Sequence, residues 1–168
     1  MSQVSFENRT VIVTGAGNGL GKAYALDLGT RGAKVVVNDL GGAVDGSGSG
    51  STPADEVVNE IIANGGEAVA NYDSVATKEG GESIVQTAID NFGTVDAIVN
   101  NAGILRDKSF ANMSEEELSL VIDVHLKGTF FVSQPAFKVM KENAYGRIVN
   151  VASPSGPVSY THLTLPTI

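Results

Sequence analysis

The chain has 168 residues, of which 42% are hydrophobic and 18% charged, and its formal net charge is −8. This composition fits one globular domain and excludes an intrinsically disordered chain. The acidic balance argues against a nucleic-acid partner, because phosphate contacts need clustered lysines and arginines. No cysteine is present, so the sequence excludes disulfides, thiolate metal sites and a cysteine nucleophile, and we expect no metal.

The amino terminus gives no sign of a targeting segment or a membrane anchor. Residues 1–10 are polar and contain Glu7 and Arg9, so they do not form the apolar core of a signal peptide. No apolar run approaches the roughly 20 residues that cross a bilayer. We therefore expect a soluble, intracellular protein without membrane contact.

Apolar, β-branched runs alternate with helical patterns along the chain. The strands are predicted at residues 10–13, 34–38, 68–72, 97–99 and 147–151. The helices are predicted at residues 19–30, 54–64, 78–91 and 114–143. Continuous runs such as VIV, KVVV and AIVN favour strands that are buried on both faces, as in a parallel sheet.

Capping residues agree with these boundaries. Gly65 and Gly93 follow the second and third helices, where a left-handed residue is common. Ser114 and Glu117 have the spacing of a capping box at the start of the fourth helix. Pro135 lies inside that long helix, and we expect it to kink the helix or split it in two.

The βαβαβαβαβ order predicts an α/β fold with a doubly wound parallel sheet and right-handed crossovers, as in Rossmann-type dinucleotide-binding proteins. The Gly- and Ser-rich residues 41–51 are expected to form a loop after the second strand. Residues 152–168 contain no charged residue and three prolines, Pro154, Pro157 and Pro166. They do not suit the next crossover helix, so we expect a sheet one strand short of the usual six.

The strongest motif, TGAGNGLG, directly follows the first strand and opens the first helix. Its glycines let the backbone approach a pyrophosphate closely, and the helix start offers free N–H groups and the positive end of a dipole. The expected cofactor-binding residues in this motif are Gly15, Asn18, Gly19, Leu20 and Gly21. The alternative is a plain glycine-rich turn, but the flanking strand and helix and an acid further along favour a dinucleotide.

That acid is Asp39, at the end of the second strand. Its carboxylate would accept hydrogen bonds from both adenosine ribose hydroxyls and would repel a 2′-phosphate, which favours NAD over NADP. The alternative is a solvated turn residue.

Two further segments that follow strands are expected at the cofactor. Asp73 and Ser74 follow the third strand. There Asp73 would accept a hydrogen bond from the adenine amino group, or else it would cap a turn. Asn101, Ala102 and Gly103 follow the fourth strand, and we expect them to combine structural and cofactor-binding roles.

In order and spacing, TGAGNGLG, NDLGG and NNAG resemble the short-chain dehydrogenase/reductase family over residues 6–156. The stretches ANYDSV, NNAGILRDKSF and VHLKGTF look like the (3R)-hydroxyacyl-CoA dehydrogenase domain of peroxisomal multifunctional β-oxidation enzymes and their bacterial relatives. The resemblance implies NAD-linked oxidation of a (3R)-hydroxyacyl-CoA, with an acyl-CoA as the small-molecule partner. It also implies a homo-oligomeric parent enzyme, peroxisomal in a eukaryote and cytoplasmic in a bacterium.

The resemblance places the catalytic serine at Ser153, with Ser155 as a near neighbour, to hydrogen-bond the substrate oxygen. A turn serine before Pro154 is the alternative. At the position where many family members have an asparagine on the fourth helix, this chain has His125. We interpret His125 as a packed or surface residue and not as a base.

The family's catalytic tyrosine and lysine have no match at the implied spacing. The tyrosine should lie about thirteen residues after Ser153, where the chain has Pro166, with the lysine four residues later. Tyr160 lies too early and is followed four residues later by Thr164, and no lysine follows Lys141. We therefore expect the chain as given to bind cofactor without turnover.

The domain expected from these observations covers residues 1–156, and residues 157–168 are interpreted as a non-native tail without stable structure. The chain is expected to be poorly folded or prone to aggregation, because a strand that would be buried becomes an edge. Three alternatives stay open: a 3-oxoacyl-carrier-protein reductase, a hydroxysteroid dehydrogenase of the same family, and a non-catalytic dinucleotide-binding module. Asp39 counts against the carrier-protein reductases, which usually prefer NADP.

Overall fold

A computed structural model describes residues 4–42 and 52–152. The strands are β1 (Thr10–Thr14), β2 (Lys34–Asn38), β3 (Glu67–Asn71), β4 (Ala97–Asn100) and β5 (Arg147–Asn150). The helices are α1 (Gly19–Thr30), α2 (Thr52–Ala63), α3 (Lys78–Phe92), α4 (Glu115–Ile122) and α5 (Gly128–Glu142). A 3₁₀ turn, η1 (Phe110–Asn112), precedes α4, and a π-helical turn, η2 (Asp123–Lys127), separates α4 from α5.

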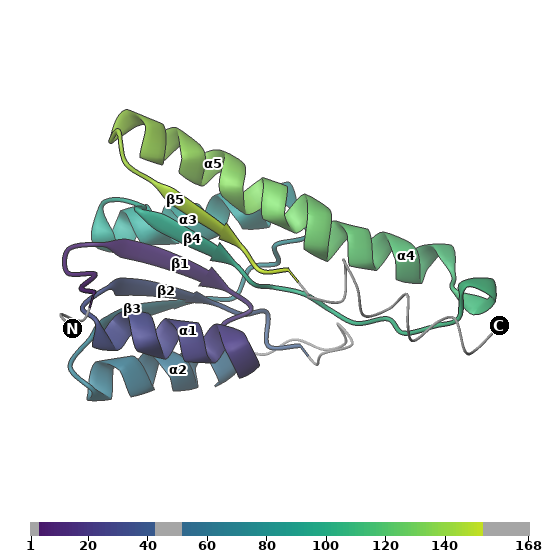
Figure 1. Cartoon of the computed structure of the whole chain (residues 1–168), viewed down its shortest axis with the longest axis horizontal. Helices are drawn as coiled ribbons and strands as arrows, with labels where there is room; N and C mark the ends of the chain where they lie inside the picture. Colours follow the sequence, from purple (N-terminus) through teal and green to yellow (C-terminus); the bar gives the residue numbers. More distant parts are fainter. Residues whose placement is uncertain (1–3, 43–51, 153–168) are drawn as a thin grey trace.

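The described strands form one parallel sheet in the order β3-β2-β1-β4-β5 (Figure 1). Val11 of β1 pairs with Val35 of β2 on one side and with Ala97 of β4 on the other. The strand order reverses between β1 and β4, and ligands of doubly wound sheets bind at the carboxyl ends of strands beside such a reversal. The doubly wound parallel fold expected from the sequence is confirmed.

Alternate residues of the sheet pack into two hydrophobic cores. Val11 and Val13 of β1 face the core beneath α1 and α2, whereas Ile12 faces the core beneath α3 and α5. Figure 1 shows α1 and α2 on one face of the sheet and α3 and α5 on the other. All residues of β1 are buried, which confirms the expectation from its continuous apolar run.

Two of the expected helix ends have the predicted geometry. Ser114 and Glu117 form a complete capping box, in which each side chain bonds the other residue's backbone N–H. Gly93 ends α3 in the left-handed conformation, with a φ angle of 79°.

The long fourth helix is split, but the split does not lie at Pro135, where the sequence predicted a kink or a split. The break is the π-helical turn η2, whereas Pro135 lies inside the continuous helix α5. Proline removes the N–H that would bond the carbonyl of Phe131, four residues earlier. That carbonyl lies against Gly81 of α3, where a Cβ atom would overlap its oxygen. Close packing on α3 therefore covers the position at which proline weakens the helix.

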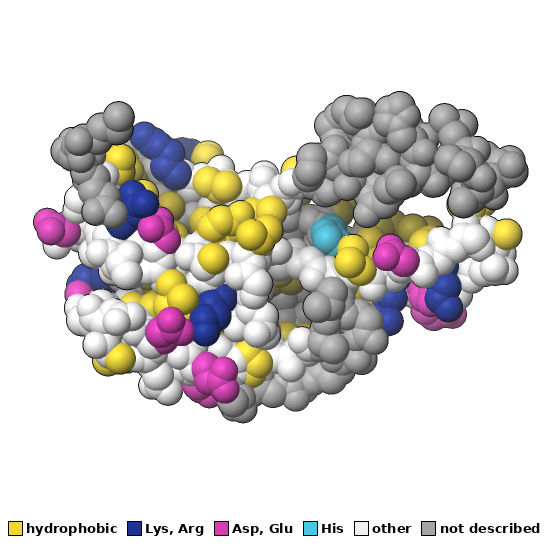
Figure 2. Space-filling view, turned by 60° about the horizontal axis from the view of Figure 1, so that its bottom comes forward, with side chains coloured by type: hydrophobic (Ala, Val, Ile, Leu, Met, Phe, Trp, Pro, Cys, Tyr) yellow, Lys and Arg dark blue, Asp and Glu magenta, His cyan; other side chains and the backbone are white. Residues whose placement is uncertain are grey.

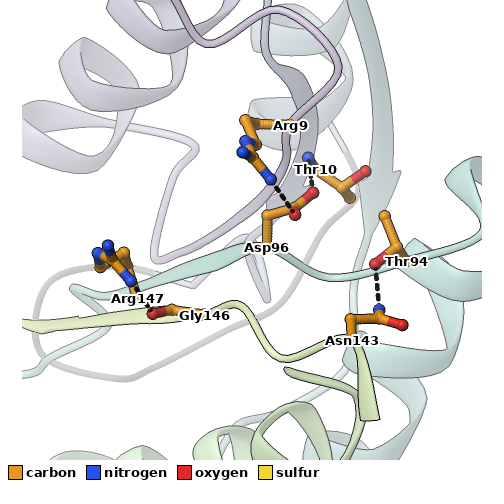
Figure 3. Close-up of polar contacts among 7 residues, drawn as sticks. All are labelled: Arg9, Thr10, Thr94, Asp96, Asn143, Gly146 and Arg147. Atoms are coloured by element: carbon orange, nitrogen blue, oxygen red, sulfur yellow. Dashed lines mark hydrogen bonds and ion pairs between the residues drawn. The ribbon is translucent and has the colours of Figure 1, made fainter. Parts of the chain in front are cut away.

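A polar cluster joins the elements at the amino ends of the strands (Figure 3). The carboxylate of Asp96 accepts hydrogen bonds from Arg9 at 3.0 Å and from the Thr10 N–H at 2.9 Å. The Arg9 guanidinium also stacks on the Tyr145 ring, 3.8 Å from its centroid. These contacts hold the start of β1 to the segments that lead into β4 and β5.

Within residues 4–42 and 52–152, no helix combines the length and the apolar character that crossing a membrane requires. The same residues contain no group of three or more His, Cys, Asp or Glu side chains suited to a metal ion.

Candidate cofactor-binding site

An open pocket of about 360 Å³ lies at the carboxyl ends of the strands. It is lined by Gly15, Asn18, Gly19, Asn38, Asp39, Leu40, Gly42, Asp73, Ser74, Val75, Asn101, Ala102, Gly103, Ile104 and Val124. The fold thus brings together the turns that follow β1, β2, β3 and β4, which are far apart in the sequence.

Of the cofactor residues expected from the sequence, all but Leu20 and Gly21 line this pocket. The Leu20 side chain is 62% exposed and lies outside the pocket lining. Gly21 is buried beneath the turn, where a Cβ atom would overlap the carbonyl oxygen of Gly15. Gly21 therefore permits close packing of the turn on α1. Ser153, the expected catalytic residue, lies outside the described residues.

The glycine-rich turn leads from β1 into α1. Gly15 and Gly19 have φ angles of 61° and 53°, a left-handed conformation that side chains disfavour. Asn18 precedes α1 in an extended conformation, and its side chain makes no capping hydrogen bond. The first turn of α1 has no acidic side chain. The start of α1 thus keeps the positive electrostatic character that suits a phosphate group.

The segment after β4 is tied to the glycine-rich turn. The Asn101 side-chain amide donates to the carbonyls of Thr14 and Gly15, both at 3.0 Å. The Thr14 hydroxyl accepts the backbone N–H groups of Asn101, at 3.1 Å, and Ala102, at 3.0 Å. Of the structural and cofactor-binding roles expected for Asn101, this geometry supports the structural one. Thr14 was missed, although a hydroxyl residue directly before the glycines was a usable signal.

Asp39 follows β2 and is half-buried at the pocket. One carboxylate oxygen accepts the Gly17 N–H at 2.7 Å, and the other accepts the Gly41 N–H at 2.8 Å. A carboxylate has about four acceptor positions, so these two bonds leave it able to accept from a ligand. The backbone thus fixes the orientation of a negative charge in the pocket.

A second network holds Asp73 after β3. Asn71 and Ser83 both donate to Oδ2 of Asp73, at 2.9 and 2.7 Å. The Asn38 amide donates to the Asn71 side chain and to the Asp73 carbonyl, at 2.8 and 2.9 Å. Asn38 is only 2% exposed and was missed, although it directly follows the apolar run of three valines in β2. These contacts position the Asp73 carboxylate at the pocket.

The neighbouring Tyr72 has a raised pKa. Its hydroxyl donates a hydrogen bond to the Asp55 carboxylate, and this bond is the main cause of the shift. The phenol therefore stays protonated at neutral pH and does not supply a base near Asp73.

His125 lies on η2 and packs against the segment that follows β4. Its Nε2 atom is 3.1 Å from the Ile104 nitrogen and 2.9 Å from the Ile104 oxygen. A Cβ atom on Gly103 would come within 2.6 Å of the imidazole ring. His125 is exposed, and its contacts with Ile104 and Gly103 support the interpretation of it as a packed or surface residue beside the pocket.

Comparison with known proteins agrees with this architecture. The model of the short chain dehydrogenase family matches residues 9–165. A peroxisomal hydratase-dehydrogenase-epimerase of Saccharomyces cerevisiae is 58% identical over 91% of this chain, which spans 17% of that protein. A 3-oxoacyl-[acyl-carrier-protein] reductase of Synechocystis is 43% identical over 88% of the chain, which spans 57% of that protein.

Two solved structures show the same fold. A short chain dehydrogenase from Mycobacterium avium is 47% identical, with a TM-score of 0.82 over 91% of this chain and 55% of that one. A 7α-hydroxysteroid dehydrogenase, solved with NADH and 7-oxo glycochenodeoxycholic acid, is 30% identical, with a TM-score of 0.83 over 92% of this chain and 57% of that one. With the family model matching most of its length, this chain belongs to the short-chain dehydrogenase family.

Proposed function

We propose that this chain forms the cofactor-binding part of an NAD-linked dehydrogenase that oxidises a secondary alcohol, a (3R)-hydroxyacyl-CoA. The observation that carries the choice of cofactor is the Asp39 carboxylate, fixed in the pocket by two backbone N–H groups. When bound, NAD would accept the hydride that leaves the alcohol carbon.

The pocket residues fit a dinucleotide. The turn at Gly15 and Gly19 has no side chain that would obstruct a pyrophosphate, and it opens at the start of α1. Asp39 would accept hydrogen bonds from the adenosine ribose hydroxyls, and Asp73 would accept one from the adenine amino group. The Asn101–Gly103 segment would lie beside the nicotinamide half. The NADH in the related hydroxysteroid dehydrogenase structure supports a nicotinamide cofactor.

Electrostatics favours NAD over NADP. A 2′-phosphate on the adenosine ribose would be placed against the Asp39 carboxylate, and like charges at short distance repel strongly. The ribose hydroxyl of NAD would instead donate a hydrogen bond to the same oxygen atoms, and such a charge-assisted bond is among the stronger ones in proteins.

The substrate proposal rests on the relatives and the motifs more than on the pocket. The yeast relative is named for hydratase, dehydrogenase and epimerase activities, which suits a 3-hydroxyacyl-CoA substrate. A carrier-protein reductase is the second candidate, favoured by the 43% identity to the Synechocystis protein. Lys108, in the loop after β4, is a candidate contact for the CoA phosphates, but it pairs with Glu117 at 3.8 Å, which favours an ordinary surface role.

Catalysis itself would require groups that this chain does not provide at the expected spacing. Ser153 is proposed to hydrogen-bond the substrate oxygen. No tyrosine in the sequence has a lysine four residues after it. We therefore propose that residues 1–156 bind NAD without turnover, as a piece of a larger homo-oligomeric enzyme, peroxisomal in a eukaryote or cytoplasmic in a bacterium. Residues 157–168 are proposed to be a non-native tail.

The test compares this chain with the full product of the gene that encodes it. NADH formation is followed with (3R)- and (3S)-hydroxyacyl-CoA, a hydroxysteroid and a hydroxyacyl carrier protein as substrates. We expect the full product to oxidise the (3R) epimer much faster than the others, and the present chain to show no steady-state turnover. Activity only on the steroid or carrier-protein substrate would overturn the substrate proposal. No dehydrogenase activity in the full product would favour a non-catalytic module.

A further inference from the structure

Gly17 is the one residue of the glycine-rich turn whose lack of a side chain concerns Asp39 directly. Gly17 is buried. A Cβ atom on it would lie 2.8 Å from both Cγ and Oδ2 of Asp39. On its other side, the same Cβ would lie 2.7 Å from Cβ of Pro53, in the first turn of α2. The space for a side chain at residue 17 is therefore filled from two sides.

The absent side chain permits one particular contact. The Gly17 N–H donates to Oδ2 of Asp39 at 2.7 Å, a short distance typical of a hydrogen bond to an ionised acceptor. Oδ1 is held by the Gly41 N–H at 2.8 Å. The carboxylate thus lies directly against the phosphate-binding turn and is held there through both of its oxygens.

We propose that Gly17 is a positioning residue for cofactor selection, because it lets the Asp39 carboxylate lie against the turn at the place where the adenosine ribose binds. The proposal rests on the proposed NAD-binding function. Pro53 belongs to a helix packed on the sheet, whereas Asp39 is a side chain that can rotate. A side chain at residue 17 would therefore displace the carboxylate. The displaced carboxylate keeps its charge but loses the geometry needed to accept the ribose hydroxyls.

Gly17→Ala should therefore weaken NAD binding through Asp39 and not through the pyrophosphate. Loss of a well-placed bond to a charged acceptor corresponds to roughly tenfold in affinity. A general distortion of the turn would weaken every ligand that carries the pyrophosphate. A displaced Asp39 would weaken only ligands that carry the hydroxyls of the adenosine ribose.

The experiment is a double-mutant cycle on the full chain, measured by calorimetric titration with NAD and with an NAD analogue whose adenosine ribose lacks both the 2′- and the 3′-hydroxyl. The four proteins are the unmutated chain, Gly17→Ala, Asp39→Asn and the double variant. We expect Gly17→Ala to cost about tenfold in NAD affinity when Asp39 is present. We expect a cost below about twofold in the Asp39→Asn background, and below about twofold for the analogue that lacks both adenosine ribose hydroxyls. Equal losses in both backgrounds and for both ligands would overturn the proposal.

Asp39→Glu tests the same idea without touching residue 17, in case Gly17→Ala does not fold. It keeps the charge but moves the carboxylate away from the Gly17 N–H, so NAD affinity should again fall about tenfold. Affinity equal to that of the unmutated chain would overturn the proposal. If the unmutated chain binds neither NAD nor NADP, the proposed function fails, and that outcome is distinct from any failure of the Gly17 assignment.

Discussion

At the scale of single residues, the proposed preference for NAD depends on Asp39. Asp39→Ala should weaken NAD binding by about tenfold or more, because both ribose hydroxyls lose a charged acceptor. NADP binding should change by less than about twofold, because the variant loses the repulsion as well. Calorimetric titration of both cofactors measures these changes. Asp90→Ala, an exposed acid on α3, is the matched control, and an equal loss for the two cofactors would contradict the ribose assignment.

The Asp96 carboxylate should matter for stability and not for the cofactor. It accepts both the Thr10 N–H and the Arg9 guanidinium, and its side chain is only 12% exposed. Asp96→Ala would leave these donors without their partner, at a cost of about 2–3 kcal/mol in the free energy of unfolding. Urea unfolding followed by circular dichroism provides the measurement.

The control for Asp96 is Asp27→Ala, which removes an ion pair with Arg31. The Asp27 side chain is 56% exposed. An exposed pair of this kind contributes less than about 1 kcal/mol. If the two variants lost the same stability, the burial of Asp96 would not be what makes its contacts strong.

At the scale of elements, the packing of α3 on α5 depends on Gly81. Alanine is the better helix former by about 1 kcal/mol, so an isolated helix would gain from Gly81→Ala. Here the added methyl group would meet the Phe131 carbonyl, and overpacking of this kind costs about 1–3 kcal/mol. We expect a net loss of stability on urea unfolding. Glu82→Ala, at the exposed neighbouring position, serves as the control, and a gain in stability from Gly81→Ala would refute close packing there.

The sequence predicted elements well where local patterns and packing agree. The apolar runs of β1 and β2 and the capping box at Ser114 all had the predicted outcome. The split of the long helix was misplaced because proline was the only local signal available. The π-helical turn at η2 has no comparable sequence pattern, and the carbonyl of Phe131, four residues before Pro135, is covered by Gly81 of α3.

For the candidate site, the sequence likewise predicted some residues and missed others. Residues that contribute through a motif, such as Gly15 and Asp39, could be found because glycines and an acid at set places after strands indicate a dinucleotide pocket. Thr14 and Asn38 act by bonding segments that are distant in the sequence, so their partners became known only from the fold. The role proposed for Gly17 likewise depends on Pro53 and Asp39 meeting in space.

At the scale of the whole molecule, β5 forms an edge of the described sheet with apolar side chains exposed. Ile148 is 40% exposed and Val149 51%, and neighbours on a strand point to opposite faces. Figure 2 shows charged side chains scattered over the face in view, between patches of hydrophobic ones. An exposed apolar edge invites association.

The present chain should therefore associate as its concentration rises, and Val149→Lys should reduce that association by placing a charge on the edge strand. Sedimentation velocity over a hundredfold range of concentration measures both effects. A chain that stayed monomeric throughout, or a variant that associated as strongly, would contradict the importance assigned to this edge. Lys138→Arg on α5, which keeps the charge, controls for nonspecific effects of substitution.

The central proposal is that the turns after β1, β2, β3 and β4, which line one pocket, form one NAD site. Its most direct test is calorimetric titration of the unmutated chain with NAD and with NADP at the same ionic strength. We expect one site per chain, with NAD bound at least about tenfold more tightly than NADP. Equal affinities, or tighter binding of NADP, would contradict it.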